Sequence, residues 1–356
     1  MTAVITGQGQ ALPGVLSQQG LWDGYFKAHY RDHPLARTVW EKSGITTRRG
    51  VVDPTREDIS TWGTAARMRR FVDEAMPLGR EAIGKALADA GLDPAEVGLL
   101  AVASCTGYAT PGLDILLARD LGMSDSTQRL HIGHMGCYAA LPGLGAVSDF
   151  VVARNKPAVL LCLELTSLHV QPAPGEEPTK ADLQQMVAHA LFSDAAAAVV
   201  LEPAAGDSPP AGLQVVDSIA RTDVSTADHM TWDVTDLGFV MGLSPRVPDV
   251  LGVHVRPVVD ELLSRNGLAV GDVDGWAVHP GGRRIVEVVG EALGLSDAQT
   301  AHSYAVLDEV GNCSSATVLL VLERLAAVPA ATDGEWVVAM AFGPGLTLCA
   351  TLLRRS

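Results

Sequence analysis

The sequence lacks several features that would assign it to a well-defined class of protein. Its 356 residues contain five cysteines and no CxxC pair, and its HxxH pair at 131–134 has no carboxylate beside it, so we predict neither a disulfide framework nor a metal site. No apolar run reaches ~18 residues, the length of a membrane-spanning helix. The N-terminus also lacks the basic and apolar regions of a signal peptide. We therefore expect a cytoplasmic protein that does not cross a membrane.

Positive charge is scarce as well. Lys and Arg number 26, whereas Asp and Glu number 41, which gives a formal net charge of −15. Such a chain has no overall attraction for a phosphate backbone, and no run of Lys and Arg supplies one locally, so nucleic-acid binding is excluded as the main function. Hydrophobic residues make up 47% and charged residues 19%, a composition that builds a buried core.

Two halves of the chain resemble each other at an offset close to 176 residues. Gly91-Leu92 recurs as Gly267-Leu268, and both pairs follow amphipathic segments and precede apolar runs. Gly136-Cys137 recurs as Gly311-Asn312, and each opens a helix rich in small residues that leads into another apolar run. A repeat of this length indicates two similar structural units.

Each half alternates predicted helices with apolar strands. We expect helices at 81–90 and 257–266, followed by strands at 99–103 and 275–278. Continuous apolar strands separated by helices are typical of a buried, mostly parallel sheet. Two such halves that share one helical layer make an α/β fold with five layers, α/β/α/β/α.

The boundary between the halves is predicted in the segment 203–212, the most Pro- and Gly-rich stretch of the chain. The halves are then residues 1–205 and residues 206–356. Residues 17–71 have no counterpart in the second half, and we interpret them as an inserted helical cap on the first.

Cys137 is the strongest candidate for a reactive residue. It lies between the strand-like segment 130–133 and a helix packed with Ala and Gly. A cysteine at a helix N-terminus feels the positive end of the helix dipole, which lowers the pKa of the thiol and favours the nucleophilic thiolate. Gly136 permits the sharp turn that exposes such a nucleophile. The alternative is a buried, inert cysteine, which is the commoner fate of a lone Cys.

His279 and Asn312 occupy related positions in the second half. His279 ends an apolar strand, and the carboxyl ends of parallel strands are where open sheets collect their ligands. Asn312 begins the helix that corresponds to the helix after Cys137. The duplication therefore predicts that Cys137, His279 and Asn312 surround one central cavity. Cys105, at the end of a first-half strand, is a further candidate for the cavity wall.

A series of short motifs runs from about residue 41 nearly to the C-terminus. They are EKSGITTRR (41–49), SCTG (104–107) with TPG (110–112), MGCYA (135–139), CLELTS (162–167), LFSDA (191–195), HPGG (279–282), GNCSSA (311–316) and FGPGLT (342–347). In this order and at this spacing, they make the chain resemble the type III polyketide synthases, the chalcone synthase superfamily. The resemblance implies a duplicated thiolase-like fold, its nucleophile in the first half and His and Asn in the second.

The resemblance implies a decarboxylating condensation of malonyl-CoA onto an acyl-CoA starter, then cyclisation to a pyrone or phenolic product, with no cofactor besides the CoA thioesters. Cys137 would carry the starter as a thioester, and His279 would hold the thiolate by ion pairing. His279 and Asn312 would stabilise the enolate oxygen left by decarboxylation, because oriented donors in a dry cavity do so better than water. A homodimer is also implied.

The resemblance further assigns residues to the CoA tunnel. Phe192 matches an aromatic gatekeeper between the tunnel and the cavity. The second gatekeeper is Met241, which we favour from its spacing to a following Val-Pro pair, or Phe239. Lys42 or Arg48 would meet the CoA phosphates near the tunnel mouth, for which the guanidinium fork of Arg is well suited.

Cys105, Thr110 and His169 align with positions that shape the elongation cavity, and Thr110 is expected to reach it from the partner subunit. His169 puts a bulky, titratable group where small residues are common, so the product of a plant relative is not transferred to this chain. The starter, the number of extensions and the mode of cyclisation depend on the cavity volume and stay open.

Three other interpretations of the sequence also stay open. A ketoacyl-ACP synthase III-like condensing or acyl-transfer enzyme has the same Cys, His and Asn set, although its His usually lies outside an HPGG motif. A non-catalytic thiolase-fold partner commonly loses one of the three residues, and all three are present here. A thioesterase-like hydrolase would release free acid without incorporating malonyl units.

Overall fold

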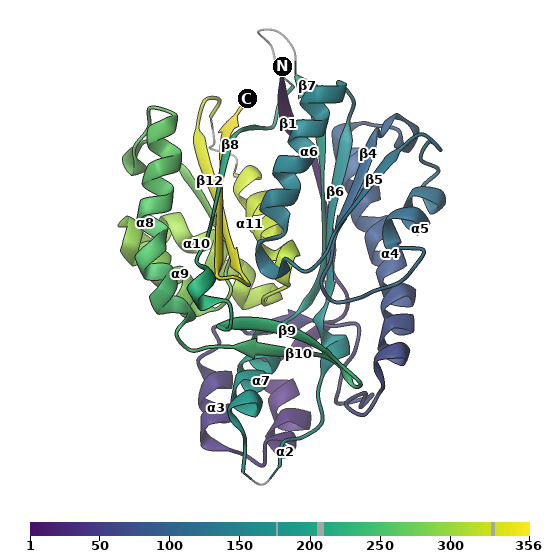
Figure 1. Ribbon diagram of the computed structural model, residues 1–356, viewed down its shortest axis with the longest axis vertical. Helices are drawn as coiled ribbons and strands as arrows, with labels where there is room; N and C mark the ends of the chain where they lie inside the picture. The colour runs from purple at the N-terminus through teal and green to yellow at the C-terminus, as the bar shows by residue number, and fades with distance from the viewer. Residues whose placement is uncertain (176, 205–209, 329–331) are drawn as a thin grey trace.

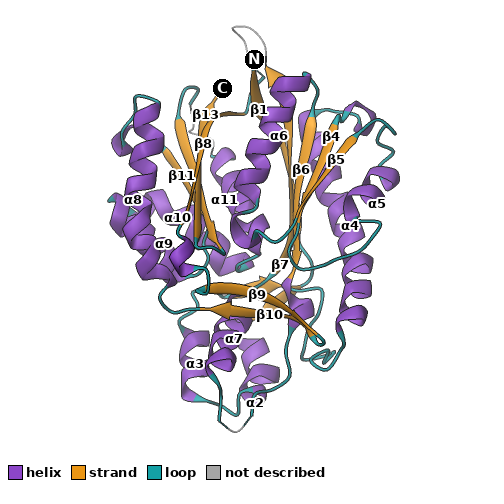
Figure 2. Ribbon diagram, viewed as in Figure 1, coloured by secondary structure: helices purple, strands orange, loops and turns teal. Residues whose placement is uncertain are grey.

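Nine strands form one hydrogen-bonded sheet that divides into two layers around central helices (Figures 1 and 2). The computed structural model describes the chain except for residues 176, 205–209 and 329–331. The strand order is β11-β12-β13-β8-β1-β7-β6-β4-β5. The strands are β1 (Thr2–Ala11), β4 (Leu99–Ala103), β5 (Gln128–Ile132), β6 (Ala158–Leu165), β7 (Asp194–Ala204), β8 (Leu213–Thr222), β11 (Gly275–Val278), β12 (Trp336–Gly343) and β13 (Thr347–Arg355).

Helices cover both outer faces and fill the space between the two layers (Figure 2). The remaining strands form two short two-stranded ribbons. One pairs β2 (Val15–Ser17) with β3 (Thr47–Arg49), and the other pairs β9 (Met230–Thr235) with β10 (Gly238–Leu243). The α-helices are α1 (Gln18–Leu21), α2 (Lys27–His29), α3 (Pro34–Glu41), α4 (Thr64–Ala90), α5 (Leu113–Asp120), α6 (Ala140–Arg154), α7 (Lys180–Leu191), α8 (Val247–Arg265), α9 (Arg283–Leu293), α10 (Asp297–Val310) and α11 (Thr317–Ala326).

The alternation of side chains along the strands confirms five layers. On β4, Leu99 and Ala101 face a core shared with α6 and α11, whereas Leu100 and Val102 face a core shared with α4. On β12, alternate residues divide in the same way between the central core and a third core that contains α8 and α9. The order is therefore α8 and α9, one sheet layer, α6 and α11, the other sheet layer, then α4 and α5 (Figure 1).

The two sheet layers meet along a short seam. Only Ala3, Val4 and Ile5 of β1 pair with β8, whereas β1 pairs with β7 along nearly its whole length. Below the seam the layers diverge, and α6 and α11 lie between them (Figure 1). Most strand pairs are antiparallel, and parallel pairing is found at β4–β5, β4–β6 and β11–β12. The expectation of a mostly parallel sheet was wrong, because the strands in the middle of the sheet, β13, β8, β1, β7 and β6, all pair antiparallel with one another.

Residues 18–41 form a lobe below the sheets with α7 and the β9–β10 ribbon (Figure 1). Its core contains Trp22, Phe26, Tyr30 and Trp40 from the N-terminal segment. The cap predicted at 17–71 does not end as expected, because α4 already begins at Thr64 and packs on the sheet. The helices predicted at 81–90 and 257–266 are the C-terminal parts of the longer α4 and α8. The linker predicted at 203–212 includes 205–209, which lie outside the described residues.

Helix α6 is the most apolar long helix of the described chain. With the turn before it, Gly136–Arg154 is long and apolar enough to cross a membrane by length and composition, and half of it is buried inside the molecule. Its place between two sheet layers accounts for this composition, since both faces that pack on a sheet are apolar.

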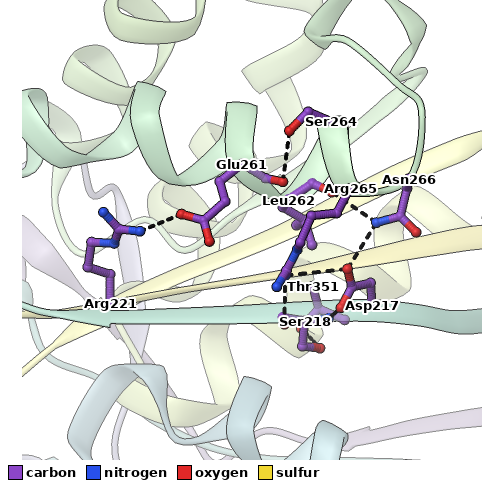
Figure 3. Close-up of polar contacts among 9 residues, drawn as sticks. All are labelled: Asp217, Ser218, Arg221, Glu261, Leu262, Ser264, Arg265, Asn266 and Thr351. Carbon is purple, nitrogen blue, oxygen red and sulfur yellow. Dashed lines mark hydrogen bonds and ion pairs between the residues drawn. The ribbon is translucent and has the colours of Figure 1, made fainter.

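Polar contacts join the outer helix α8 to β8 (Figure 3). Asp217 accepts a hydrogen bond from Asn266 Nδ2 at 3.0 Å and lies 3.3 Å from Arg265 Nη2, and Arg221 pairs with Glu261. The charged groups in these pairs are about half exposed, so each pair contributes little to stability. They fix the direction of α8, while the Val and Leu side chains beneath it supply the packing energy.

The close approach of α4 to β1 depends on glycine. A Cβ added at Gly9 would lie 2.4 Å from the carbonyl oxygen of Ala82 and 2.5 Å from the backbone nitrogen of Ala86. Both are backbone atoms of α4, so they cannot move aside without moving the helix.

Replacing Gly9 with Ala is expected to reduce the free energy of unfolding by about 1–3 kcal/mol, because the methyl group overpacks this contact. Gly84→Ala is the matched control, since Gly84 lies inside α4 with no atom within 4 Å of an added Cβ. It should stabilise the protein by about 0.5–1 kcal/mol through helix propensity. Denaturant unfolding of both variants measures these changes, and a Gly9→Ala protein as stable as the wild type would contradict the packing argument.

Candidate active site

Cys137 lies in a tight turn that leads into α6. The turn is the 3-10 segment Gly136–Tyr138, and Cys137 is buried within it. Gly136 has φ +68°, and a Cβ added there would lie 2.9 Å from Pro344 Cδ, so glycine is required on two counts. In the second half the corresponding 3-10 turn, before α11, begins at Ser314 with φ +50°. Cys137 is the second residue of its turn, whereas Asn312 lies two residues before the start of the other, so the predicted equivalence of the two residues was wrong by three positions.

A cavity of about 140 Å³ opens in front of Cys137. An engineered cavity of about 150 Å³ in another protein holds a benzene molecule, so this one has room for a ring of that size. Its wall is more apolar than polar, and both halves of the chain contribute to it. The wall consists of Cys105, Thr106, His134, Gly136, Cys137, Thr166, Phe192, Met230, Thr231, Trp232, Met241, Ser314 and Pro344.

His279 and Asn312 lie just behind this wall and are linked to each other. Asn312 Nδ2 donates to the carbonyl oxygen of Gly281 at 3.1 Å, and a Cβ built on Gly281 would lie 3.5 Å from His279 Nε2. Asn312 Oδ1 accepts from the backbone nitrogen of Ser314, a wall residue, at 2.9 Å. The His279 side chain is 1% exposed, and neither of its ring nitrogens has a hydrogen-bond partner among the described residues. Both ring nitrogens of His279 are therefore unused within the described structure.

Burial acts in opposite directions on Cys137 and His279. It raises the pKa of the Cys137 thiol to about 12, although the neighbouring Ser314 hydroxyl lowers it, and it lowers the pKa of the His279 imidazole to about 3. The helix dipole therefore does not produce a thiolate by itself, and this part of the sequence prediction was wrong. A thiolate at Cys137 requires a proton acceptor such as His279, so that the two charges form together and compensate each other.

Glu164 is a site residue to which the sequence analysis gave no role. Its side chain is fully buried, and it accepts hydrogen bonds from Ser315 Oγ and Thr106 Oγ1, both at 2.7 Å, and from the backbone nitrogen of Cys105 at 3.0 Å. Burial raises the pKa of this carboxyl group. One signal was available, since Glu164 is the lone acidic residue in the otherwise apolar strand β6.

Cys105 lies in the cavity wall as predicted from its position after β4. Its Sγ is 3.5 Å from Glu164 Oε1 and 3.8 Å from Ser314 Oγ. Burial, and then the negative charge of Glu164, raise the pKa of this thiol well above its ordinary value. Cys105 is therefore a neutral wall residue beside Cys137.

The two candidates for the second gatekeeper lie in different places. Met241 lines the cavity together with Phe192, whereas Phe239 stacks on the ring of His169 with a centroid distance of 4.5 Å. His169 is itself buried, accepts from the Phe239 backbone nitrogen through Nδ1 and donates through Nε2 to a carbonyl oxygen. Burial lowers its pKa to about 4, so it is neutral near pH 7. Phe239 and His169 lie behind Trp232, a wall residue absent from the sequence prediction.

The two residues predicted to contact the CoA phosphates differ in their burial. Lys42 is exposed at the end of α3, as a phosphate contact requires. Arg48 is 5% exposed, and its guanidinium donates to the carbonyl oxygens of His189 and Phe192. Arg48 therefore faces the interior and cannot contact a phosphate at a tunnel mouth. Thr110 is exposed in the loop after β4, where a second subunit could meet it, and its reach into a partner's cavity stays a prediction.

Among the described residues, no group of three or more His, Cys, Asp or Glu side chains is placed to hold a metal ion.

Two family models match nearly all of this chain. The N-terminal domain of the chalcone and stilbene synthases matches residues 2–205, and the C-terminal domain matches residues 216–356. The alpha-pyrone synthesis polyketide synthase-like protein Pks18 of Mycobacterium tuberculosis is 36% identical over 321 residues, 87% of this chain and 79% of that protein. The 1,3,6,8-tetrahydroxynaphthalene synthase of Streptomyces peucetius is 33% identical over 325 residues, 91% of this chain and 84% of that protein.

Solved structures have the same fold. The crystal structure of 1,3,6,8-tetrahydroxynaphthalene synthase from Streptomyces coelicolor matches with a TM-score of 0.91 and 27% identity, over 99% of each chain. The five layers and this similarity define a thiolase-like enzyme of the acyltransferase type, which confirms the predicted fold class. The chain belongs to the chalcone and stilbene synthase family, the type III polyketide synthases, whose members join acyl units by condensation.

Replacing His279 with Ala should slow the alkylation of Cys137 by iodoacetamide at pH 7 by about tenfold or more. Burial raises the pKa of the Cys137 thiol to about 12, so its thiolate fraction is very small unless a proton acceptor takes the proton. The rate is followed by mass spectrometry in a Cys105→Ser background, so that modification reports on Cys137 alone.

His302→Ala is the control, because His302 lies on α10 and outside the cavity wall. Equal alkylation rates in the wild type and the His279→Ala variant would show that Cys137 is activated without His279.

Proposed function

We propose that this protein is a type III polyketide synthase that loads an acyl-CoA starter onto Cys137 and extends it with malonyl-CoA. The observation that carries the proposal is the arrangement around the cavity: a nucleophile in its wall at a helix start, with a buried imidazole and an oriented amide behind that wall. Cys137, His279 and Asn312 are all present, which argues against a non-catalytic thiolase-fold partner.

In the loading step, Cys137 gives its proton to His279 and attacks the thioester carbonyl of the starter. The sulfur–acyl bond of the starter breaks as the new one forms, and CoA leaves with the proton from His279. Exchange of one thioester for another is nearly thermoneutral, so the same cysteine can be reloaded repeatedly.

In the extension step, malonyl-CoA loses carbon dioxide, and the electrons of the broken carbon–carbon bond move to the thioester oxygen as an enolate. Asn312 Nδ2 has two hydrogens, and Gly281 accepts one of them, so the other can stabilise this oxygen. His279 supplies the second donor. The enolate carbon then attacks the thioester on Cys137 and releases the Cys137 thiolate.

The product class is proposed from the relatives and the cavity. Of the relatives named above, Pks18 is named for alpha-pyrone synthesis and the other is a tetrahydroxynaphthalene synthase. We therefore propose a pyrone or a phenol as the product. A cavity of about 140 Å³, bounded by Phe192, Met241 and Trp232, is compatible with a single ring. We assign the gatekeeper roles to Phe192 and Met241, and the contact with the CoA phosphates to Lys42.

We also propose that the enzyme is a homodimer of the cytoplasm. Strand β5 is the last of the sheet, and its residues from Gln128 to His131 are exposed. A bare sheet edge is a template for pairing with another copy, and Thr110 lies in the loop after its neighbour β4. All five cysteines are free, in agreement with a reducing compartment.

The proposed activity is tested with isotope-labelled malonyl-CoA and a panel of acyl-CoA starters. Mass spectrometry should detect labelled pyrones or phenols with the wild type, and Cys137→Ala should reduce their formation by at least about 10³-fold, because no thioester can form. Cys162→Ala, a change at a buried cysteine outside the cavity wall, is the control. Activity only with carrier-bound substrates would favour the ketoacyl-ACP synthase III-like alternative, and free acid without label would favour a hydrolase.

The proposed dimer is tested by light scattering after size-exclusion chromatography. The wild type should have twice the mass of one chain, and Leu130→Asp should shift the population toward the monomer, because it places a charge on the β5 edge. Val253→Asp is the control, since Val253 is 69% exposed on α8, on the opposite side of the molecule (Figure 1). A monomeric wild type would refute the homodimer.

A further inference from the structure

The end of α7 is held by residues from distant parts of the chain. The last carbonyl groups of a helix have no partners within the helix and need donors from elsewhere. The carbonyl oxygen of Ala190 accepts from Gln18 Nε2 at 2.9 Å, and that of Leu191 accepts from the backbone nitrogen of Asn312 at 3.0 Å. The catalytic loop of the second half is thus bonded directly to this helix end.

Arg48 supplies the remaining contacts at the same place. Its Nη1 donates to the carbonyl oxygen of His189 and, at 3.0 Å, to that of Phe192. The guanidinium carbon lies 5.2 Å from the ring centroid of Trp40 and 5.9 Å from that of Phe26, so aromatic rings hold it from another side. One side chain therefore binds the end of the helix and the residue that follows it.

The Arg48 guanidinium contacts the helix end directly, whereas the negative charge of Asp194 acts on it only from farther away. No ion pair in the described part of the chain includes Arg48. Burial lowers its pKa to about 10, so the group is still charged near pH 7. A cation at a helix C-terminus is favourable, because the carbonyl groups there carry the negative end of the dipole.

Phe192 is the point where this support reaches the cavity. It is the first residue after α7, with φ −75° and ψ 149°, and it forms a β-bridge with Asn312. Phe192 lies in the cavity wall, and its carbonyl oxygen accepts a hydrogen bond from Arg48. The direction of the ring therefore depends on a backbone segment fixed from behind by Arg48.

We propose that Arg48 is a positioning residue for starter selection, which fixes the Phe192 ring in the cavity wall by holding the Phe192 carbonyl oxygen to the end of α7. The proposal rests on the proposed function, in which Phe192 is a gatekeeper. Arg48 touches no substrate in this role. It replaces the contact with CoA phosphates that the sequence predicted for the same residue.

The test compares kcat/KM for two starters of different width, such as hexanoyl-CoA and benzoyl-CoA, in the wild type and in Arg48→Met. The ratio of the two values should change by about tenfold, which is the size of a single pocket contact. Arg48→Lys keeps the charge and reaches one carbonyl oxygen, so it should give an intermediate ratio. If the Arg48→Met protein does not fold, Arg48→Lys still tests the proposal.

A double-mutant cycle separates this role from a loss of stability. In a Phe192→Ala background, Arg48→Met should change the starter ratio by less than about twofold, because the ring that Arg48 positions is gone. Arg67→Met is the matched control: Arg67 is also fully buried, donates to the carbonyl oxygens of Trp62 and Leu168, and has a pKa lowered to about 10. It should reduce the melting temperature without changing the starter ratio.

Three results would overturn the proposal: an unchanged ratio in both Arg48 variants, the same change in Arg67→Met, or independent effects of Arg48→Met and Phe192→Ala. In each case the wild type still makes polyketides, so the proposed function stands. A wild type that makes none would refute the proposed function, and the role of Arg48 with it.

Discussion

The fold and the site both depend on the layer of helices that the two sheet layers share. Helices α6 and α11 are covered on both sides, and their first turns lie close together at the same end of that layer. One turn carries Cys137 and the other begins at Ser314. The layer ends above at the β1–β8 seam, and the β9–β10 ribbon and the lobe of residues 18–41 lie below it, so Cys137 and Ser314 at these turns are buried.

Burial determines the chemistry of the residues around that space. Burial disfavours a lone thiolate at Cys137 and a lone imidazolium at His279, so neither charge is stable by itself. The same burial makes each oriented donor stronger, since electrostatic interactions are stronger in surroundings of low polarity. The neutral Cys105 and His169 fit this environment, and Glu164 is accommodated because several donors surround it.

Sequence reasoning succeeded where the signal was local. Strands β4 and β11 begin and end at the predicted residues, because each is an apolar run bounded by turn residues. The turn at Gly136 and the nearby cavity followed from a strand, a glycine and a helix of small residues. The five layers followed from the internal repeat, which needs no knowledge of distant contacts.

It failed where the outcome depends on residues far apart in the chain. Arg48 lies in a motif that suits a surface phosphate contact, but the aromatic cluster of the cap and the end of α7 enclose it. Phe239 and Met241 are two residues apart on β10, so the strand period places both on the same face, and spacing alone did not say which of the two borders the cavity. Trp232 was missed because its strand pairs with β10 in a ribbon that the repeat does not contain.

The position of the chain ends has a consequence for how this enzyme can be joined to others. Both ends lie at the top of the molecule beside the β1–β8 seam, and Ser356 exchanges backbone hydrogen bonds with Gly212 there (Figure 1). The cap lobe lies at the opposite pole. A fused carrier, tag or neighbouring catalytic module would therefore emerge away from the cap, and two enzymes of a pathway could be tethered through either end without the linker crossing this lobe.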